Sequence, residues 1–72
     1  MKISYDKEAD AMYICMQKIK AGEVKKTIAL NDDIIVDFDK NKKILGIEIL
    51  SASKNLHKKE IQELAVIKAQ SQ

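Results

Sequence analysis

The sequence predicts an α+β domain, with an antiparallel β-meander of four to five strands followed by a C-terminal helix packed on one sheet face. Two observations carry this prediction. Short runs with an apolar residue at every second position fill the chain from Lys2 to Leu50, and that is the period of a strand. After Leu50 the apolar residues recur every three or four positions, which is the period of a helix. We therefore expect a single domain over residues 1–72, with the sheet in residues 2–50 and a helical segment in residues 52–69.

The clearest element is a hairpin predicted over Ile34–Ser53, where two alternating apolar runs flank a short lysine-rich turn. Each run presents an apolar triplet on one face. If the two triplets pair, Val36 lies opposite Ile47, because a slip of one residue would expose a whole triplet. The triplets are Ile34, Val36 and Phe38, and Leu45, Ile47 and Ile49.

The other strands are expected at Lys2–Tyr5, Ala11–Gln17 and Val24–Leu30, separated by polar joints. The second of these is apolar on both faces, which is typical of a central strand. Asn31, Asp32 and Asp33 favour a tight turn before the hairpin, since their side chains satisfy turn backbone. The pattern does not fix the register of the third strand.

Beyond the sheet, Ser51 and Ser53 offer hydroxyls that can cap a helix, and residues 52–56 predict one helical turn. A longer helix is expected from Lys58 onward, with Gln70–Gln72 frayed at its end. The stripe that predicts this helix consists of Ile61, Leu64, Ala65 and Lys68.

Composition excludes several classes of protein. No apolar run approaches the ~20 residues of a spanning helix, and the polar N-terminal segment does not resemble a secretory signal. With Cys15 as the single cysteine, expected to be a packing residue, we predict a cytoplasmic protein. The net charge is only +2 and all thirteen basic residues are lysines, so sequence-specific nucleic-acid binding is not expected. Non-specific nucleic-acid binding is a further hypothesis, through Lys18, Lys20, Lys25 and Lys26.

Asp37 and Glu48 are the candidate ligands for a metal or a small molecule. In the register described above, Asp37 lies opposite Gly46 and diagonal to Glu48 on the outer face, with ~7–8 Å between the backbones. Two such carboxylates can share a metal, a proton or a basic partner, and the glycine leaves room between them. The alternative is a polar outer face with lysine partners, or a structural hydrogen-bonding site for a neighbouring loop.

No other residues predict a catalytic or metal centre. The alternating acids that begin at Asp6 resemble the start of a calcium loop, but its sixth and twelfth positions hold Ala11 and Gln17 instead of Gly and Glu. His57 has no second histidine to share a metal with. We therefore expect no cofactor and no enzymatic activity.

The apolar residues exceed what one helix can cover. An apolar patch left open on a small domain usually marks a partner site, and association stabilises a domain of this size. We therefore expect a homodimer, with a different protein on the same surface as the alternative. The expected interaction surface consists of Tyr13, Cys15, Ile35 and Ile44.

Three blocks of the sequence resemble a known family. They read Y-D-x-E-x-D-A-x-Y-I from Tyr5, N-D-D-I-I-V-D-F-D from Asn31 and I-L-G-I-E-I-L-x-A-S from Ile44. In this order and spacing they are similar to the bacterial domain of unknown function catalogued as family 2283, over Lys2 to about Leu56. The chain departs from the family at the last hairpin turn, where Asn41 and Lys42 stand in place of the usual glycine.

The resemblance implies a small β-meander with a following helix, and it brings no activity, cofactor or catalytic residue. Some members are similar to the antidote-like partner of a compact ribonuclease-like toxin. We therefore expect a non-enzymatic protein-interaction or self-associating module, with an antitoxin-like partner of a small toxin as one version. The alternative is a small ligand- or metal-binding module that uses the outer-face carboxylates.

Overall fold

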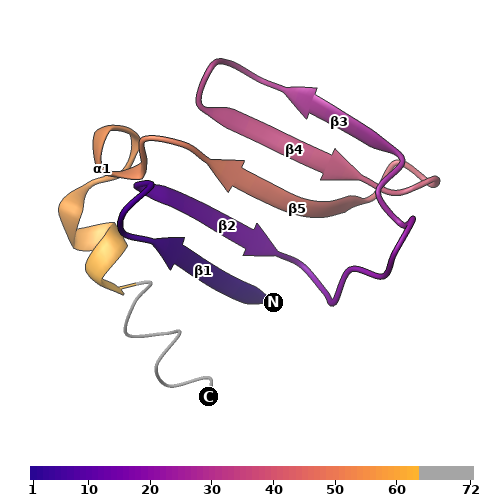
Figure 1. The fold of residues 1–72 in the computed structure, drawn as a ribbon, viewed down its shortest axis with the longest axis horizontal. Coiled ribbons are helices and arrows are strands. Elements are labelled where there is room, and N and C mark those ends of the chain that lie inside the picture. The colour runs from indigo at the N-terminus through magenta and orange to yellow at the C-terminus, as the bar shows by residue number, and fades with distance from the viewer. Residues whose placement is uncertain (64–72) are drawn as a thin grey trace.

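The computed structural model describes residues 1–63, which form one five-stranded antiparallel sheet followed by helical segments (Figure 1). The predicted α+β class is confirmed. Helix α1 (Ala52–Asn55) follows the sheet directly, and residues 58–63 are helical again. Neither helical segment in this described part is long and apolar enough to cross a membrane. The strands are β1 (Lys2–Asp6), β2 (Ala11–Cys15), β3 (Lys26–Ala29), β4 (Ile34–Phe38) and β5 (Ile44–Ile49).

The strand order, β1-β2-β5-β4-β3, is not that of a simple meander. The chain leaves β2, crosses to the far edge of the sheet to form β3, and returns through β4 to place β5 against β2 (Figure 1). Strand β2 therefore pairs with β1 along one edge and with β5 along the other. The prediction that β2 is an inner strand is confirmed, and β3 becomes an edge.

The register of the β4–β5 hairpin is the predicted one at its centre, where Val36 pairs with Ile47 and Asp37 with Gly46. Directly after Asp37 the register shifts, so that Phe38 lies opposite Ile44. This irregularity breaks the alternation that assigned Ile44 to the face of Tyr13. The sequence pattern did not predict it, because a β-bulge depends on local backbone geometry.

The main buried cluster lies at the end of the sheet nearest the helices, and Val36 and Leu45 are buried further along β4 and β5. Leu56 and Ile61 pack against a buried cluster, so the segment after the sheet covers one face as predicted. The cluster consists of Ile3, Met12, Ile49 and Ala52. The rest of the predicted helix, with Leu64, Ala65, Lys68 and Gln70–Gln72, lies outside the described residues.

Three tight turns are stabilised by the same device. In each, one side-chain oxygen accepts hydrogen bonds of 2.8–3.2 Å from two backbone N–H groups further along the turn. This is the geometry that favours Asp and Asn in turns. The alternating acids that begin at Asp6 thus start a turn between two strands. The accepting side chains are Asp6, Asn31 and Asp39.

Candidate functional site

Tyr13 lies across Gly46 on the sheet face opposite the core. A Cβ atom built on Gly46 would overlap the hydroxyl and the Cζ atom of the Tyr13 ring, so only glycine leaves room for it. From this position the Tyr13 hydroxyl donates a 3.1 Å hydrogen bond to Oδ2 of Asp37. The Thr27 hydroxyl donates a 2.8 Å bond to Oδ1 of the same carboxylate. One aspartate on β4 thus connects β2 and β3.

The Tyr13 hydroxyl is held in its neutral form. Burial, and then the hydrogen bond to Asp37, raise the pKa of Tyr13 to about 12. The phenol therefore keeps its proton near neutral pH and acts as a hydrogen-bond donor. The bonds of Tyr13 and Thr27 to Asp37 hold neighbouring strands together. For Asp37, they correspond to the structural hydrogen-bonding site that the sequence left open as an alternative.

The candidate ligands Asp37 and Glu48 are arranged as predicted. Asp37 pairs with Gly46, and Glu48 lies two positions along β5, opposite Tyr13 on one side and Ile35 on the other. However, both oxygens of the Asp37 carboxylate already accept a hydrogen bond. Within residues 1–63, no group of three or more His, Cys, Asp or Glu side chains is placed to hold a metal ion. A ligand role for Asp37 and Glu48 stays a prediction.

A second polar network fastens the start of α1 to the β1–β2 turn. Asp10 accepts a 2.7 Å bond from the Tyr5 hydroxyl at Oδ1 and a 2.5 Å bond from the Ser53 hydroxyl at Oδ2. The backbone N–H of Ser53 donates to both carboxylate oxygens, and that of Ala52 donates to the Asp10 carbonyl at 2.8 Å. The bonds from Ser53 and then Tyr5 lower the pKa of Asp10, and the same bond to Asp10 raises the pKa of Tyr5.

Sequence reasoning missed this network because Asp10 and Ser53 are 43 residues apart. Its local signal is the backbone of Asp10, which is left-handed with a φ of 51°. Asp and Asn tolerate that conformation better than most residues, and here it turns the carboxylate toward α1.

Asn55 makes a similar attachment from the other end of α1. Its amide donates to the Asp33 carboxylate and to the Leu50 carbonyl at 3.0 Å each, and to the Ser51 carbonyl at 3.1 Å. The amide therefore connects the helix with the β3–β4 turn and with the end of β5.

The expected interaction surface is less open than the pattern suggested. Tyr13, Cys15 and Ile35 are half-buried, whereas Ile44 is 46% exposed. Three strongly exposed apolar residues instead lie on or beside β3. They are Val24 at 39%, Ile28 at 36% and Leu30 at 66% exposure. Among the described residues, β3 and its flanks thus carry three of the exposed large apolar side chains, and the others are Met1, Met16 and Ile44.

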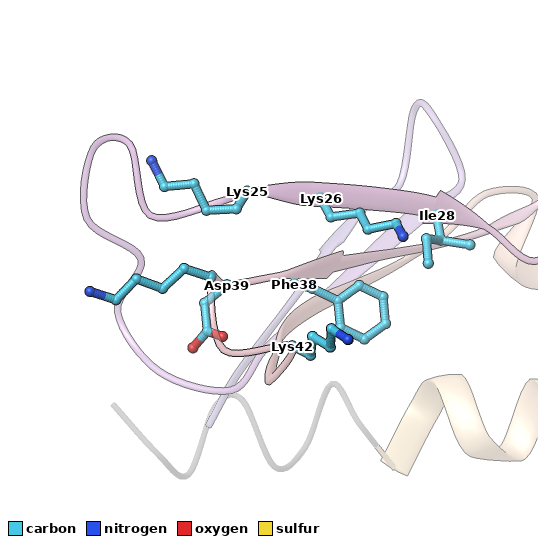
Figure 2. A pocket seen from close by; sticks show the side chains of 7 residues that line it. Lys25, Lys26, Ile28, Phe38, Asp39 and Lys42 are labelled. Atoms are coloured by element: carbon cyan, nitrogen blue, oxygen red, sulfur yellow. The ribbon is translucent and has the colours of Figure 1, made fainter.

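A shallow hollow of about 400 Å³ opens between β3 and the β4–β5 turn, and we call it the Phe38 hollow (Figure 2). The Phe38 ring and Ile28 line it with apolar surface. Figure 2 shows the Lys26 and Lys42 side chains beside them, whereas Lys25 extends away from the ring. A second hollow of about 390 Å³ adjoins it and shares Lys25, Asp39 and Lys40. The Phe38 hollow is lined by Lys25, Lys26, Ile28, Phe38, Asp39, Lys40 and Lys42.

A family model described as a protein of unknown function, DUF2283, matches residues 2–53. The match covers all five strands and the start of α1. The chain belongs to DUF2283. The resemblance seen in the sequence is therefore confirmed at the level of the family.

One relative of this DUF2283 chain is the uncharacterized protein MJ0789 of Methanocaldococcus jannaschii, 48% identical over 54 residues. The alignment covers 75% of this chain and 43% of the relative, so the chain spans less than half of that protein's length. That organism is an archaeon, so the expected bacterial origin of the domain is not confirmed. No solved structure matches the chain.

The three blocks that carried the DUF2283 resemblance supply every side chain of the two polar networks except Thr27. The first block contributes Tyr5, Asp10 and Tyr13, the second contributes Asp37, and the third supplies Ser53 together with Gly46 beneath the Tyr13 ring. These residues fasten strands and helix to one another. The surfaces that these networks leave open to a partner include the β3 edge and the two hollows.

Proposed function

We propose that this chain is a non-enzymatic protein-interaction module that pairs with a second copy of itself through strand β3. The observation that carries the proposal is the exposure of β3, whose four residues are all exposed at one edge of the sheet. A free edge strand is a template for pairing with another strand. A domain of this size also gains stability from association.

The hydrogen bonds between β3 and β4 show which backbone N–H and C=O groups of β3 remain available for pairing. Leu30 donates its N–H to the Ile34 carbonyl at 2.7 Å, so this residue turns its backbone toward β4. Residues along an antiparallel strand alternate between bonding one neighbour and facing the other side. Ile28 therefore also faces β4, and Thr27 and Ala29 direct their N–H and C=O groups to the free edge.

An antiparallel two-fold pairing uses these groups directly. If Thr27 of one copy bonds Ala29 of the other, Ile28 meets its own counterpart at the symmetry axis. Ile28 lies opposite Val36 within each copy, so the apolar row on that face would continue from one sheet into the next. The exposed side chain of Leu30 would lie beside the stem of Lys26 of the second copy.

Charge at the two ends of β3 supports the antiparallel direction. Lys25 and Lys26 stand at its start, whereas Asp32 and Asp33 follow its end. In the register above, Lys26 is diagonal to Asp32 of the second copy. A parallel pairing would instead place lysines beside lysines, which is unfavourable.

The proposal is tested by the mass in solution, measured by sedimentation over a range of concentrations. We expect a monomer–dimer equilibrium. Ala29→Pro should shift it to monomer without unfolding the chain, because it removes an N–H that β4 does not use and edge strands tolerate proline. Lys26→Glu should weaken the dimer, and adding Asp32→Lys to Lys26→Glu should restore it.

A single-chain mass at every concentration would refute the self-association. So would a dimer that Ala29→Pro leaves unchanged, since pairing would then use another surface, such as the face of Tyr13 and Ile35. A small toxin-like protein that binds this edge while the chain alone stays monomeric would also refute it, in favour of the antitoxin-like version.

A ligand- or metal-binding role for Asp37 and Glu48 is a second candidate, supported by their diagonal placement on the outer face. A metal at this point must compete with the hydroxyls of Tyr13 and Thr27 for the Asp37 carboxylate. Thermal denaturation with and without divalent cations tests this role, and an unchanged melting temperature would exclude it.

A further inference from the structure

We propose that the Phe38 hollow binds single-stranded nucleic acid, with one base against Phe38 and the phosphates on the surrounding lysines. The site does not depend on dimer formation. One copy supplies every residue that lines the hollow. Two of these residues, Lys26 and Ile28, also lie at the proposed β3 pairing edge, whereas Phe38 and Lys40 do not.

The floor of the hollow suits a flat, apolar group. Phe38 is half-buried, so the sheet holds its ring in place while part of it remains open. Ile28, 36% exposed, adds an aliphatic surface beside it. Stacking on a fixed aromatic ring is the usual way in which proteins hold an unpaired base, and it tolerates every base.

The rim of the hollow supplies positive charge. Four lysines line the hollow, from two separate segments of the chain that the fold brings together: Lys25, Lys26, Lys40 and Lys42 (Figure 2). The one acid among the lining residues, Asp39, accepts hydrogen bonds from the N–H groups of Asn41 and Lys43, so its carboxylate is turned toward the turn backbone.

The adjoining hollow favours a strand over a free nucleotide. It shares Lys25 and Lys40 with the Phe38 hollow and adds Lys20. The row of lysines therefore extends beyond the hollow that would hold one base. Of its two acids, Asp39 is shared with the Phe38 hollow, and Glu23 accepts a bond from the backbone N–H of Lys20. A polyanion that runs from one hollow to the other contacts more lysines than a mononucleotide can.

The absence of arginine from the sequence points to binding without base preference. Lysine holds a phosphate as a point charge but lacks the planar fork that reads guanine. Affinity from phosphate contacts falls as salt increases, because bound counterions are released. Strong salt dependence and indifference to base identity are therefore both expected.

Fluorescence polarisation of a labelled oligothymidylate at low salt tests the proposal. We expect saturable binding by the wild-type chain. Phe38→Leu, which keeps an apolar residue on β4, should weaken it about five-fold or more. Lys40→Gln, at an exposed turn position, should weaken it and reduce the slope against salt by about 0.7. Lys7→Gln removes an equal charge at the opposite end of the sheet, in the β1–β2 turn, and should leave both unchanged.

Three results would overturn the inference. Equal affinity for oligothymidylate and for an abasic strand of the same length would show that no base stacks on Phe38. Equal effects of Lys40→Gln and Lys7→Gln would show that binding follows total charge. Thymidine monophosphate bound as tightly as the oligonucleotide would show that the adjoining hollow takes no part.

Discussion

Gly46→Ala tests whether the glycine is needed for the Tyr13 ring. The added methyl overlaps the hydroxyl and Cζ of Tyr13, so the ring must move off the sheet. Displacement of the ring costs packing, about 1–3 kcal/mol, and breaks the hydrogen bond to Asp37, about 1.5–3 kcal/mol because the acceptor is charged. The alanine also stabilises the fold by about 0.4–1 kcal/mol, because it reduces the entropy of the unfolded chain.

The expected net loss is about 2–5 kcal/mol in the free energy of unfolding. The whole chain of 72 residues is expected to have roughly 4–11 kcal/mol, so this loss is large. Urea denaturation followed by far-ultraviolet circular dichroism measures it. The melting temperature should fall by roughly 8–40 °C, since each kcal/mol corresponds to about 4–8 °C in a domain of this size.

A double-mutant cycle isolates the cause. In a Tyr13→Ala background the ring is absent, so Gly46→Ala should cost far less than in the wild type, and the two substitutions should be strongly non-additive. If Gly46→Ala is equally harmful in both backgrounds, or harmless in both, the glycine does not serve the ring and the reasoning is refuted.

Three further predictions concern the polar networks. The pKa of Asp10 is lowered in the folded chain, so its contribution to the free energy of unfolding is present above the ordinary pKa of Asp, near pH ~4, and is lost as the pH falls through the lowered value. Asp10→Asn should therefore lower the urea midpoint at neutral pH and make that midpoint less dependent on acid pH. An unchanged dependence on acid pH would contradict this. The pKa of Tyr13 is raised, so its contribution to the free energy of unfolding is full below pH ~10 and is lost as the pH rises through about 12. In Tyr5→Phe, Tyr13 is the remaining tyrosine, and its phenolate absorbance should rise near pH 12. A midpoint near pH ~10 would refute the burial. Asn55→Ala removes an amide whose two N–H groups are shared among three acceptors, and it should destabilise by about 1–3 kcal/mol in urea unfolding. The neighbouring Lys54→Ala, also at an exposed position, should stay within about 0.5 kcal/mol.

The sequence predicted the features that depend on local alternation. The β4–β5 register follows from two apolar triplets, because pairing Val36 with Ile47 is the arrangement that buries both. The turns follow from Asp and Asn at positions where a side-chain oxygen reaches two backbone N–H groups. The inner position of β2 follows from apolar residues on both of its faces.

Features that join distant segments were not predicted. Nothing in the pattern of β2 distinguishes β3 from β5 as its neighbour, so the strand order needed the structure. The same is true of the bond between Asp10 and Ser53. The lysines of the Phe38 hollow come from the start of β3 and from the β4–β5 turn, and only the fold places them around one ring. The displaced position of Ile44 came from a register shift that apolar alternation does not record.

The boundary between β2 and β5 divides the sheet into two parts that are each continuous along the chain: a hairpin of β1 and β2, and a three-stranded unit of β3, β4 and β5. Residues 16–25, which connect them, contain no strand or helix. Proteolytic cleavage within this connection would leave two fragments with complementary edges, and we expect them to recombine as split halves do in fragment complementation. The same boundary joins residues far apart in the sequence, such as Met12 and Ile49, so its closure should be the slow step of folding.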